Sequence, residues 1–428
     1  MNGHSTLNQR TAWLIVALLV PVALLNYLDR QMLAAMKLSV MRDIPDIGTE
    51  ENWGLILGWF KWTYAGVSPF GGFVADRFGR KRVVAFSLFV WSLVTLATGL
   101  VQSYPQLVVT RAFMGISEAC YIPAALALIT EYHLGLTRSR AVGFHQMGIY
   151  AGVITGSFAG YLAEAPSLGW RAGFEWCGIV GMLYALPLLW LLGRAAAPEN
   201  STTRVERISF QPTMRALLTN GSFILLVLYF TLPAFPAWVV RDWMPAILQK
   251  ELNLKQGLAG VSAVVWWQSA AIVSATLGGW MADRWMRRSE RGRINASAIG
   301  MTLIVPALFG TGIVLGQKSL ALAIAFLILF GLGWGLFDAN NMPILCQIVR
   351  PEHRATGYGL MNLVSISFGG FADWTFGWLR DRHVPLSGIF TAFAAMAAAS
   401  IALVLLIKPR GEDAEVRVSR NIDTPRSS

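Results

Sequence analysis

Apolar segments of about twenty residues recur along the whole chain, and no other feature restricts its possible folds as strongly. An α-helix rises about 1.5 Å per residue, so about 20 residues cross a hydrocarbon core roughly 30 Å thick. We therefore predict an all-α membrane protein. Its expected spans are residues 12–35, 53–75, 82–101, 106–131, 140–163, 172–194, 219–248, 258–282, 294–315, 320–349, 354–379 and 386–408.

The charged residues support this class. Only 14% of the 428 residues are charged, whereas a soluble protein has about a quarter. The net charge is +11, but the basic residues gather in the short connections between apolar segments, as cytoplasmic loops do. We therefore expect the lipid bilayer, and not nucleic acid, as the partner of this charge. Cys120, Cys177 and Cys346 all lie within apolar segments, which favours packing over disulfides or a metal site.

The basic connections follow the second, fourth, sixth, eighth and tenth spans, and both terminal segments are basic too. The opposite connections are acidic or neutral, apart from residues 380–383. The positive-inside rule therefore places both termini in the cytoplasm, and we expect the location to be a bacterial inner membrane. The longest polar connection suggests an N-terminal six-helix bundle at 10–194, a cytoplasmic linker at 195–218, a C-terminal six-helix bundle at 219–410 and a cytoplasmic tail at 411–428.

The two halves of the chain repeat one another. "GGFVADRFGRKR" (71–82) returns as "GGWMADRWMRRS" (278–289), "GISEACYIP" (115–123) as "GLFDANNMP" (335–343), and "RAVG" (140–143) as "RATG" (354–357). Parallel six-helix repeats occur in secondary transporters, whose substrate site lies between the halves near the middle of the membrane. The repeat therefore favours a transporter with a central site.

Residues 72–81 resemble the G-x-x-x-D-R-x-G-R-[KR] loop of the major facilitator superfamily. The resemblance covers residues 10–410 and implies twelve transmembrane helices in two pseudo-symmetric six-helix bundles. It also implies a gating role for Gly72, Asp76, Arg77, Gly79, Arg80, Gly279, Asp283 and Arg284. We expect Gly72 to let its helix pack closely against a neighbour, and the charged members to pair at helix ends.

Other residues resemble two groups within that superfamily. "NYLDR" in the first span, with Arg111 and Glu118 in the fourth, is similar to the anion:cation symporters and to the spinster-like carriers. Arg241 in "RDWMPAIL" is similar to an arginine of the glutamate carriers, and Asn362 to an asparagine of the sugar-acid carriers. The resemblance thus implies an anion or a lipid as substrate.

Charges inside a span are functional candidates, because they are costly unless paired or wetted. Asp29 lies roughly 25 Å from the cytoplasmic end and Arg111 roughly 8 Å from the periplasmic end, so their depths nearly coincide. We expect these two to form a proton-sensitive ion pair. Arg30 would then face the cavity and hold an anion, and Glu118, near the midplane, would be the main proton carrier. The alternative is a buried ion-pair network that only fixes helix packing.

Asp338 is the counterpart of Glu118 in the repeat, so we assign it to proton coupling as well. The expected substrate-binding residues are Tyr27, Arg30, Lys61, Tyr64, Arg241, Gln268, Asn340, Asn341 and Asn362, with Trp266 and Trp267 ranked lower. Arg241 alternatively snorkels to water, because it lies near the membrane surface. The sequence lacks metal-ligand spacings, a nucleophile elbow and a phosphate loop, so we expect neither a metal, a cofactor nor an enzyme.

These residues favour a monomeric, proton-coupled symporter of a small organic anion such as a sugar acid or related carboxylate. Na⁺ is an alternative to H⁺. A spinster-like lipid or lysolipid carrier shares the same residues in the first and fourth spans, although Lys61 and the two asparagines argue against an apolar route. A multidrug/H⁺ antiporter fits less well, because "GIYAGVITGSFAG" lacks the Gly-Pro signature of those exporters. A non-transporting sensor is the fourth possibility.

Overall fold

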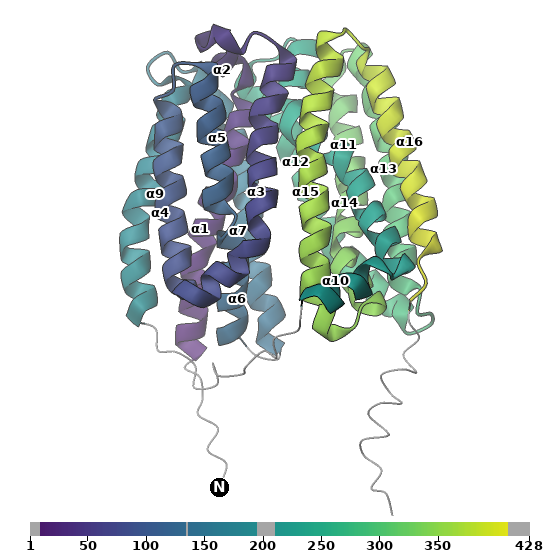
Figure 1. The fold of residues 1–428 in the computed structure, drawn as a ribbon. Helices are drawn as coiled ribbons and strands as arrows, with labels where there is room; N and C mark the ends of the chain where they lie inside the picture. The colour runs from purple at the N-terminus through teal and green to yellow at the C-terminus, as the bar shows by residue number, and fades with distance from the viewer. Residues whose placement is uncertain (1–8, 134–135, 195–209, 410–428) are drawn as a thin grey trace, which may run out of the picture.

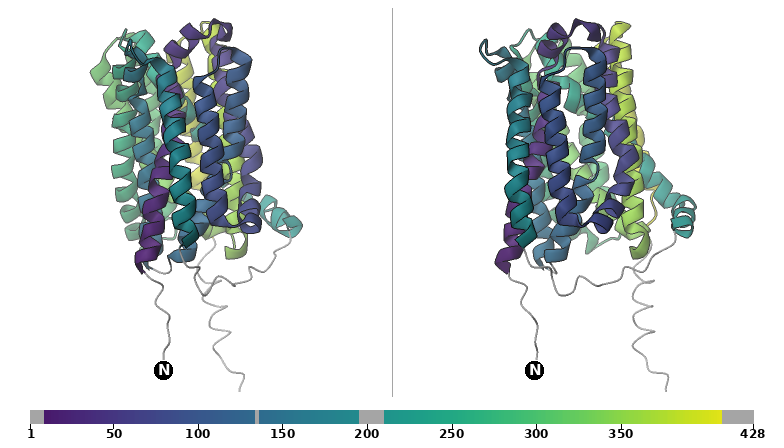
Figure 2. Two further views of the ribbon diagram at one scale, coloured as in Figure 1. Left: turned by 90° about the vertical axis from the view of Figure 1, so that its left-hand side faces the viewer. Right: turned by 60° about the vertical axis from the view of Figure 1, so that its left-hand side comes forward.

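The computed structural model describes residues 9–133, 136–194 and 210–409, and long helices run side by side through it (Figures 1 and 2). Within these residues, twelve helical segments match the twelve predicted spans. They are α1 (Gln9–Ala35), α3 (Glu50–Phe78), α4 (Arg80–Gly99), α5 with α6 (Tyr104–Glu118 and Tyr121–Tyr132), α7 with α8 (Leu136–Ser157 and Ala159–Glu164), α9 (Gly169–Arg194), α11 (Gly221–Glu251), α12 (Gln256–Met286), α13 (Gly292–Gly316), α14 (Leu320–Ile348), α15 (Arg354–Asp381) and α16 (Leu386–Leu406). The predicted all-α membrane fold is confirmed.

Four short helices complete the described chain: α2 (Lys37–Asp43), η1 (Pro45–Ile47), α10 (Phe210–Leu218) and η2 (Pro351–His353). We call α1–α9 the N-half and α10–α16 the C-half. The start of α1 and the end of α16 lie at the same end of the bundle, which we call the terminal end (Figure 1). α2 lies at the opposite end, which we call the α2 end. Most of the predicted linker and the predicted tail at 411–428 lie outside the described residues.

Nine of the described spans are long and apolar enough to cross a membrane by composition alone. The segments that fall short are α3, α7 with α8, and α15. Each of α3, α7 and α15 supplies polar side chains to the interior cavity described below.

The fourth predicted span, 106–131, is interrupted by a turn directly after Glu118. Pro123 lacks the N–H that would bond to the carbonyl of Ala119 four residues earlier, and a proline ring also crowds that carbonyl. The helix therefore ends as α5 and resumes as α6 at Tyr121. As a result, Glu118 occupies the last turn of α5.

Glycines at four-residue spacing bring α7 against α1. A Cβ on Gly148, Gly152 or Gly156 would collide with backbone carbonyl oxygens of α1 at Val20, Leu24 and Leu28, respectively. In α14, Gly331 and Gly335 face backbone carbonyl oxygens of α12 in the same way. Small residues on one helix face let two backbones approach closely inside a membrane, where apolar side chains alone give little driving force.

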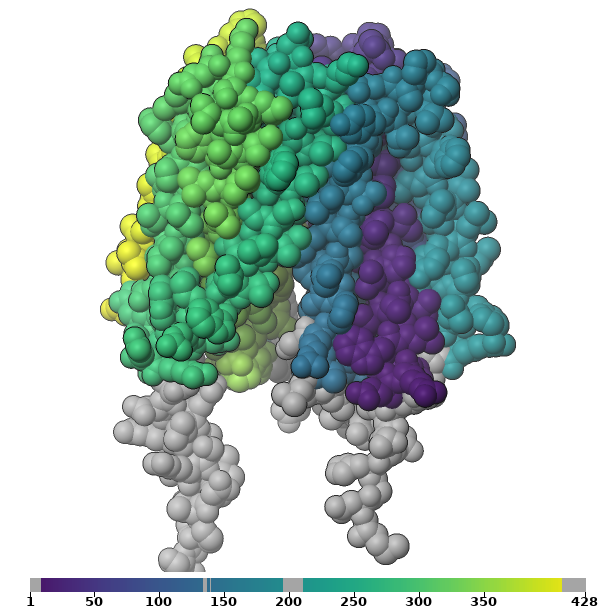
Figure 3. Space-filling model, turned by 180° about the vertical axis from the view of Figure 1, so that it is seen from behind, coloured from purple at the N-terminus to yellow at the C-terminus, as the bar shows by residue number. Residues whose placement is uncertain are grey.

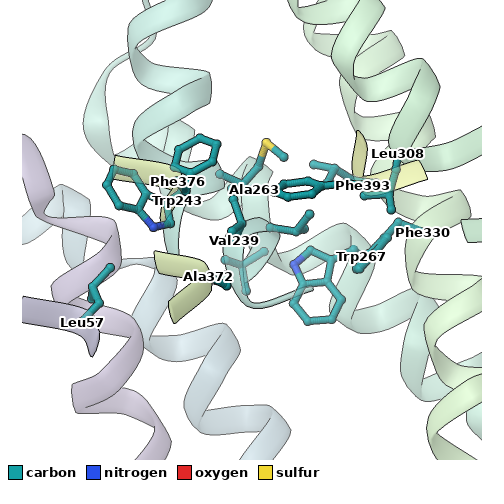
Figure 4. Packing of buried hydrophobic residues seen from close by; sticks show 14 of the residues in the cluster. Leu57, Val239, Trp243, Ala263, Trp267, Leu308, Phe330, Ala372, Phe376 and Phe393 are labelled. Atoms are coloured by element: carbon teal, nitrogen blue, oxygen red, sulfur yellow. The ribbon is translucent and has the colours of Figure 1, made fainter. Parts of the chain in front are cut away.

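Aromatic and aliphatic side chains fill the C-half between α11, α12, α14 and α15 (Figure 4). The rings of Trp243 and Phe376 meet with centroids 4.8 Å apart, and Trp267 meets Phe330 at 5.9 Å. Leu57 of α3 belongs to the same cluster, so the buried core continues from the C-half into the N-half. This continuity occurs on the α2-end side, where the halves are in contact.

The halves are joined from mid-depth to the α2 end. Asp381 at the end of α15 accepts N–H groups from Glu50 (3.0 Å) and Glu51 (2.8 Å) in the first turn of α3. Gly54 lies so close to the backbone of Asp373 that a Cβ would collide with it. Among the described residues, the hydrogen bonds between the halves are confined to this region. Toward the terminal end the surface is hollowed between the halves (Figure 3).

Replacement of Gly152 by leucine should destabilise the fold by about 1–3 kcal/mol, because the side chain would push α7 away from α1. Thermal unfolding of the purified protein in detergent measures this effect. Gly143→Leu is the matched control. Gly143 lies on the same helix, but a Cβ there would meet nothing within 4 Å. Equal losses in the two variants would show that the close approach does not matter.

Candidate functional site

A cavity of about 250 Å³ lies between the halves. It is bounded by α1, α3 and α7 of the N-half and by α11, α12, α14 and α15 of the C-half. Three basic side chains, one acidic side chain and nine aromatic rings face it. Its charged and aromatic lining residues are Arg30, Lys61, Arg241, Asp338, Tyr27, Phe60, Tyr64, Tyr150, Phe230, Trp238, Trp267, Trp334 and Tyr358.

Most of the residues expected to bind substrate line this cavity, namely Tyr27, Arg30, Lys61, Tyr64, Arg241, Gln268 and Asn362. Asn340 and Asn341 are the exceptions. Both are buried in helix packing, and Asn340 donates its amide N–H to the carbonyl of Leu336 at 2.9 Å. Asn340 is two residues beyond the cavity-lining Asp338 and so faces nearly the opposite side of α14.

Arg30 and Glu118 form the ion pair of the N-half. The Nε of Arg30 donates to Glu118 Oε2 at 2.7 Å, and its terminal nitrogen lies 2.5 Å from the same oxygen. The guanidinium also lies over Tyr27, Phe60 and Tyr64, at 4.7, 4.7 and 5.0 Å from the ring centroids. Glu118 is fully buried behind it, so Arg30 separates the carboxylate from the cavity.

The expected ion pair between Asp29 and Arg111 is not formed in this structure. Asp29 instead accepts a hydrogen bond from Thr95 of α4 at 3.0 Å. The guanidinium of Arg111 lies 4.7 Å from the centroid of Phe60, and one of its nitrogens is 2.8 Å from the sulfur of Met114. Depth along a helix does not determine which neighbour a side chain faces, so similar expected depths did not suffice to predict a pair.

Lys61 is held by two acidic residues of the C-half. Its Nζ lies 2.5 Å from Asp242 Oδ2 and also contacts Asp373 Oδ2. The other oxygen of Asp373 accepts the indole N–H of Trp243 at 3.2 Å. Asp373 was absent from the predicted site, although it is a charge inside the predicted span 354–379. Asp29 was selected because it is a charge inside a span, and the same criterion would have selected Asp373.

Arg241 lines the cavity without an acidic partner within 4 Å in the described part of the chain. Its guanidinium lies 5.2 Å from the centroid of Tyr27 and 5.5 Å from that of Trp238. Gln31 of α1 contacts its backbone carbonyl at 3.4 Å. Arg241 therefore presents a positive charge without a direct ion pair among the described residues, and it reaches the cavity instead of snorkelling to the membrane surface.

Several cavity residues were not anticipated from the sequence, namely Phe60, Gln146, Tyr150, Phe230, Trp238, Trp334, Tyr358 and Ser365. Aromatic residues are common in membrane helices as packing and interface groups, so their identity carries little information about a cavity. Their shared orientation becomes visible only when seven helices are assembled.

The motif at residues 72–81 lies at the terminal end, away from the cavity. Arg80 bonds Asp76 (3.1 Å) and Glu131 of α6 (3.0 Å), which joins the α3–α4 turn to its neighbour. Gly79 has a φ of 90°, a backbone conformation that glycine adopts at little cost. Arg77 is exposed beside them. In the C-half copy, Arg284 is exposed and Asp283 lies 3.7 Å from Arg293.

The packing role expected for Gly72 is wrong in this structure. A Cβ on Gly72, or on Gly279 in the copy, would meet nothing within 4 Å. The preceding glycines make the close contacts: Gly71 faces the backbone of Ala119 in the α5–α6 turn, and Gly278 faces Leu336 of α14. A shift of one residue turns a helix by about 100°, which explains why the motif position points away.

Arg30→Ala should lower the free energy of unfolding by about 3–5 kcal/mol near pH 8, because it leaves Glu118 buried without its cation. The difference from the wild type should shrink as the pH falls, since protonation removes the unpaired charge. Thermal unfolding between pH 5 and 8 measures both effects. The double variant Arg30→Ala with Glu118→Gln should lose the pH dependence. If Arg30→Ala lost the same stability relative to the wild type at every pH, the loss would not come from the charge of Glu118.

Comparisons with known proteins identify the family of this chain. The sequence model of the Major Facilitator Superfamily matches residues 19–373. The chain is 28% identical to the cis,cis-muconate transport protein of Acinetobacter baylyi, over 96% of this chain and 98% of that protein. It is 24% identical to the hexuronate transporter of Bacillus subtilis, over 95% of this chain and 98% of that protein.

The chain is also 25% identical to protein spinster of Drosophila melanogaster, over 84% of this chain but only 60% of the length of spinster. The fold is similar to that of a bacterial homolog of the human lysosomal transporter spinster in an inward-facing, occupied conformation. The TM-score is 0.76 at 19% identity, over 92% of this chain and 96% of the other. With the family model matched over most of the helical bundle, the chain belongs to the Major Facilitator Superfamily.

Proposed function

We propose that this transporter is a proton-coupled symporter of a small organic anion, such as a sugar acid or a related carboxylate, that works by alternating access. The single observation that carries the proposal is Arg241, a cavity cation with no carboxylate within 4 Å among the described residues. An unpaired guanidinium inside a membrane protein is costly, and a bound carboxylate supplies bidentate compensation.

The other cavity groups suit such a ligand. Arg30 of α1 and Arg241 of α11 both lie near the ring of Tyr27, at 4.7 and 5.2 Å from its centroid, so one anion bound by both would contact both halves. Gln268 and Asn362 offer amide groups for hydroxyls or a second carboxylate. Muconate and hexuronate, the substrates named for two relatives, are small molecules with carboxylates. Ligand contacts with both halves are what alternating access requires.

Proton coupling follows from the pairing of Arg30 with Glu118. While Glu118 is ionised, it holds the guanidinium that lines the cavity. Protonation of Glu118 would release Arg30 to bind the anion, so proton and anion would load together. Asp29, buried beside the same pair, and Asp338, which faces the cavity, are further candidates for this coupling, and Arg111 sets the local charge balance.

The conformation fits one state of an alternating-access cycle. The α2 end is closed by contacts between α3 and α15, and the hollow between the halves faces the terminal end (Figure 3). We assign the terminal end to the cytoplasm of a bacterial cell, because the basic connections lie there. Two bundles at 10–194 and 219–410 would then move about the cavity as a monomer, and the motif residues at the terminal end would close in the opposite state.

A spinster-like lipid carrier is the second candidate, because the spinster relatives share the fold. An apolar groove on the outer face of the N-half, lined by Leu25, Met32, Phe158 and Trp176 among others, suits an acyl chain. It shares no lining residue with the central cavity. The three basic residues of the cavity favour the anion.

Arg241→Gln should raise the KM for the transported anion by about 10- to 100-fold, because it removes a charge-assisted bond worth about 1.5–3 kcal/mol. Initial uptake rates in proteoliposomes measure this constant. Arg380→Gln is the matched control: Arg380 pairs with Glu251 at the α2 end, outside the cavity, and its loss should leave KM unchanged. A KM that is unaffected by Arg241→Gln would remove the main support for an anion.

Uptake into proteoliposomes under an imposed pH gradient tests the function itself, with sugar acids, monocarboxylates, dicarboxylates and lysolipids offered in turn. We expect an acid to accumulate against its gradient, and Glu118→Gln to lose proton-driven accumulation while still exchanging substrate. A parallel Na⁺ gradient separates the two possible coupling ions. Movement of lysolipid alone, or normal accumulation by Glu118→Gln, would overturn the proposal.

A further inference from the structure

Lys61 belongs to the N-half, yet its ammonium group is held entirely by the C-half. It contacts Asp373 and lies 2.5 Å from Asp242. It also lies 4.3 Å from the ring centroid of Trp238. The three partners belong to α11 and α15, so this lysine bridges the halves on the side of the cavity nearest the α2 end.

The two carboxylates depend on that lysine. Asp373 is completely buried and Asp242 is 8% exposed. The other cations that interact electrostatically with this pair are Arg241 on α11, which attracts both carboxylates, and Arg111 on α5, which attracts Asp242. Among the described residues, only the ammonium group of Lys61 lies within 4 Å of a carboxylate oxygen of Asp242 or Asp373. The position of Lys61 therefore determines whether these two carboxylates have a cation in contact with them.

Opening of the α2 end would separate the lysine from its partners. Lys61 travels with α3, whereas Asp242 and Asp373 stay with α11 and α15. A buried carboxylate that loses its counter-charge is strongly destabilised. A proton entering from the newly opened side removes that charge without any further rearrangement of the helices.

We propose that Asp373, together with Asp242, is a second proton-binding site, and that Lys61 and a proton occupy it in alternation. Lys61 fills the site while the α2 end is closed, and a proton fills it while that end is open. The inference rests on the proposed function, since it assumes proton-coupled transport. It adds a coupling site in the C-half to the one formed by Glu118 in the N-half.

The same exchange would load the anion. Once Lys61 leaves the carboxylates, its ammonium group can donate to a carboxylate in the cavity that it already lines. Closure of the α2 end returns Lys61 to Asp373, so the anion loses a ligand and the proton leaves toward the terminal end. The O–H bond of the aspartic acid forms on one side of the membrane and breaks on the other, and no other reactant is consumed.

The test is the slope of log accumulation ratio against the pH gradient in proteoliposomes, with the membrane potential clamped at zero. Each coupled proton contributes about tenfold accumulation per pH unit. We expect the slope of Asp373→Asn to fall by about one relative to the wild type. Asp381→Asn is the control, because Asp381 also joins α15 to α3 but does not contact Lys61. We expect its slope to match the wild type.

The outcomes separate the two proposals. A wild-type slope of zero would overturn the proposed function, whereas a coupled wild type with an unchanged Asp373→Asn slope would overturn only this inference. An equal fall in Asp381→Asn would also overturn it, because the effect would then come from weakened contact between the halves.

A second measurement follows the α2 end directly. Ser39 of α2 bonds Gln256 of α12 across the halves at 3.2 Å, so Ser39→Cys reports on closure when the native cysteines are replaced. We express labelling by an impermeant maleimide relative to its reaction with free cysteine at the same pH, because the thiolate that reacts becomes scarcer as the pH falls. We expect this relative rate to rise as the pH on the α2-end side falls, and Asp373→Asn to abolish the rise. A relative rate that does not depend on pH in the otherwise wild-type chain would contradict the alternation.

Discussion

The need to neutralise charge inside the membrane links most features of this structure. Four basic and five acidic residues lie around the middle of the bundle, and each must find a partner or water. Arg30 is paired with Glu118, and Lys61 with Asp242 and Asp373. Asp29, Arg111, Arg241 and Asp338 have no oppositely charged partner within 4 Å among the described residues, and of these four Arg241 and Asp338 face the cavity. We interpret the ion pairs as the groups that set the conformational state, and the unpaired charges that face the cavity as the place for a ligand.

Close backbone contacts give these charges their geometry. Gly148, Gly152 and Gly156 bring α7 against α1, and Gly54 brings α3 against α15. The first contact lies within the N-half, whereas the second joins the halves and must break whenever the α2 end opens. The same seam also holds apolar side chains of both halves, such as Leu57 of α3 and Phe376 of α15, so opening the α2 end would part an apolar contact as well as a backbone one. Lys61 lies at this seam, so the movement that opens the α2 end also changes the pairing of these charges.

The anion and lipid candidates share one fold, and the distinction between them comes from the lining of the cavity. Aromatic rings surround the cavity and lie over its guanidinium groups, as Tyr27 lies over both Arg30 and Arg241. Such rings exclude water while leaving the cations able to bind, which strengthens the attraction for a small anion. The apolar groove on the outer face of the N-half lacks these cations, so the two surfaces of the protein suit different ligands.

The spans, the repeat, the loop motif and most charged cavity residues were predictable from the sequence, because a hydrocarbon solvent imposes length and polarity rules on each helix separately. Tertiary structure decided the rest. Similar expected depths did not make Asp29 and Arg111 a pair, because the partner of each charged side chain depended on how α1 and α5 are rotated against each other. Asn340 turned away from the cavity, and Asp373 joined Lys61 across 312 positions of sequence. Helix rotation and the close approach of distant segments arise from packing between helices, and a local pattern in one helix does not contain that information.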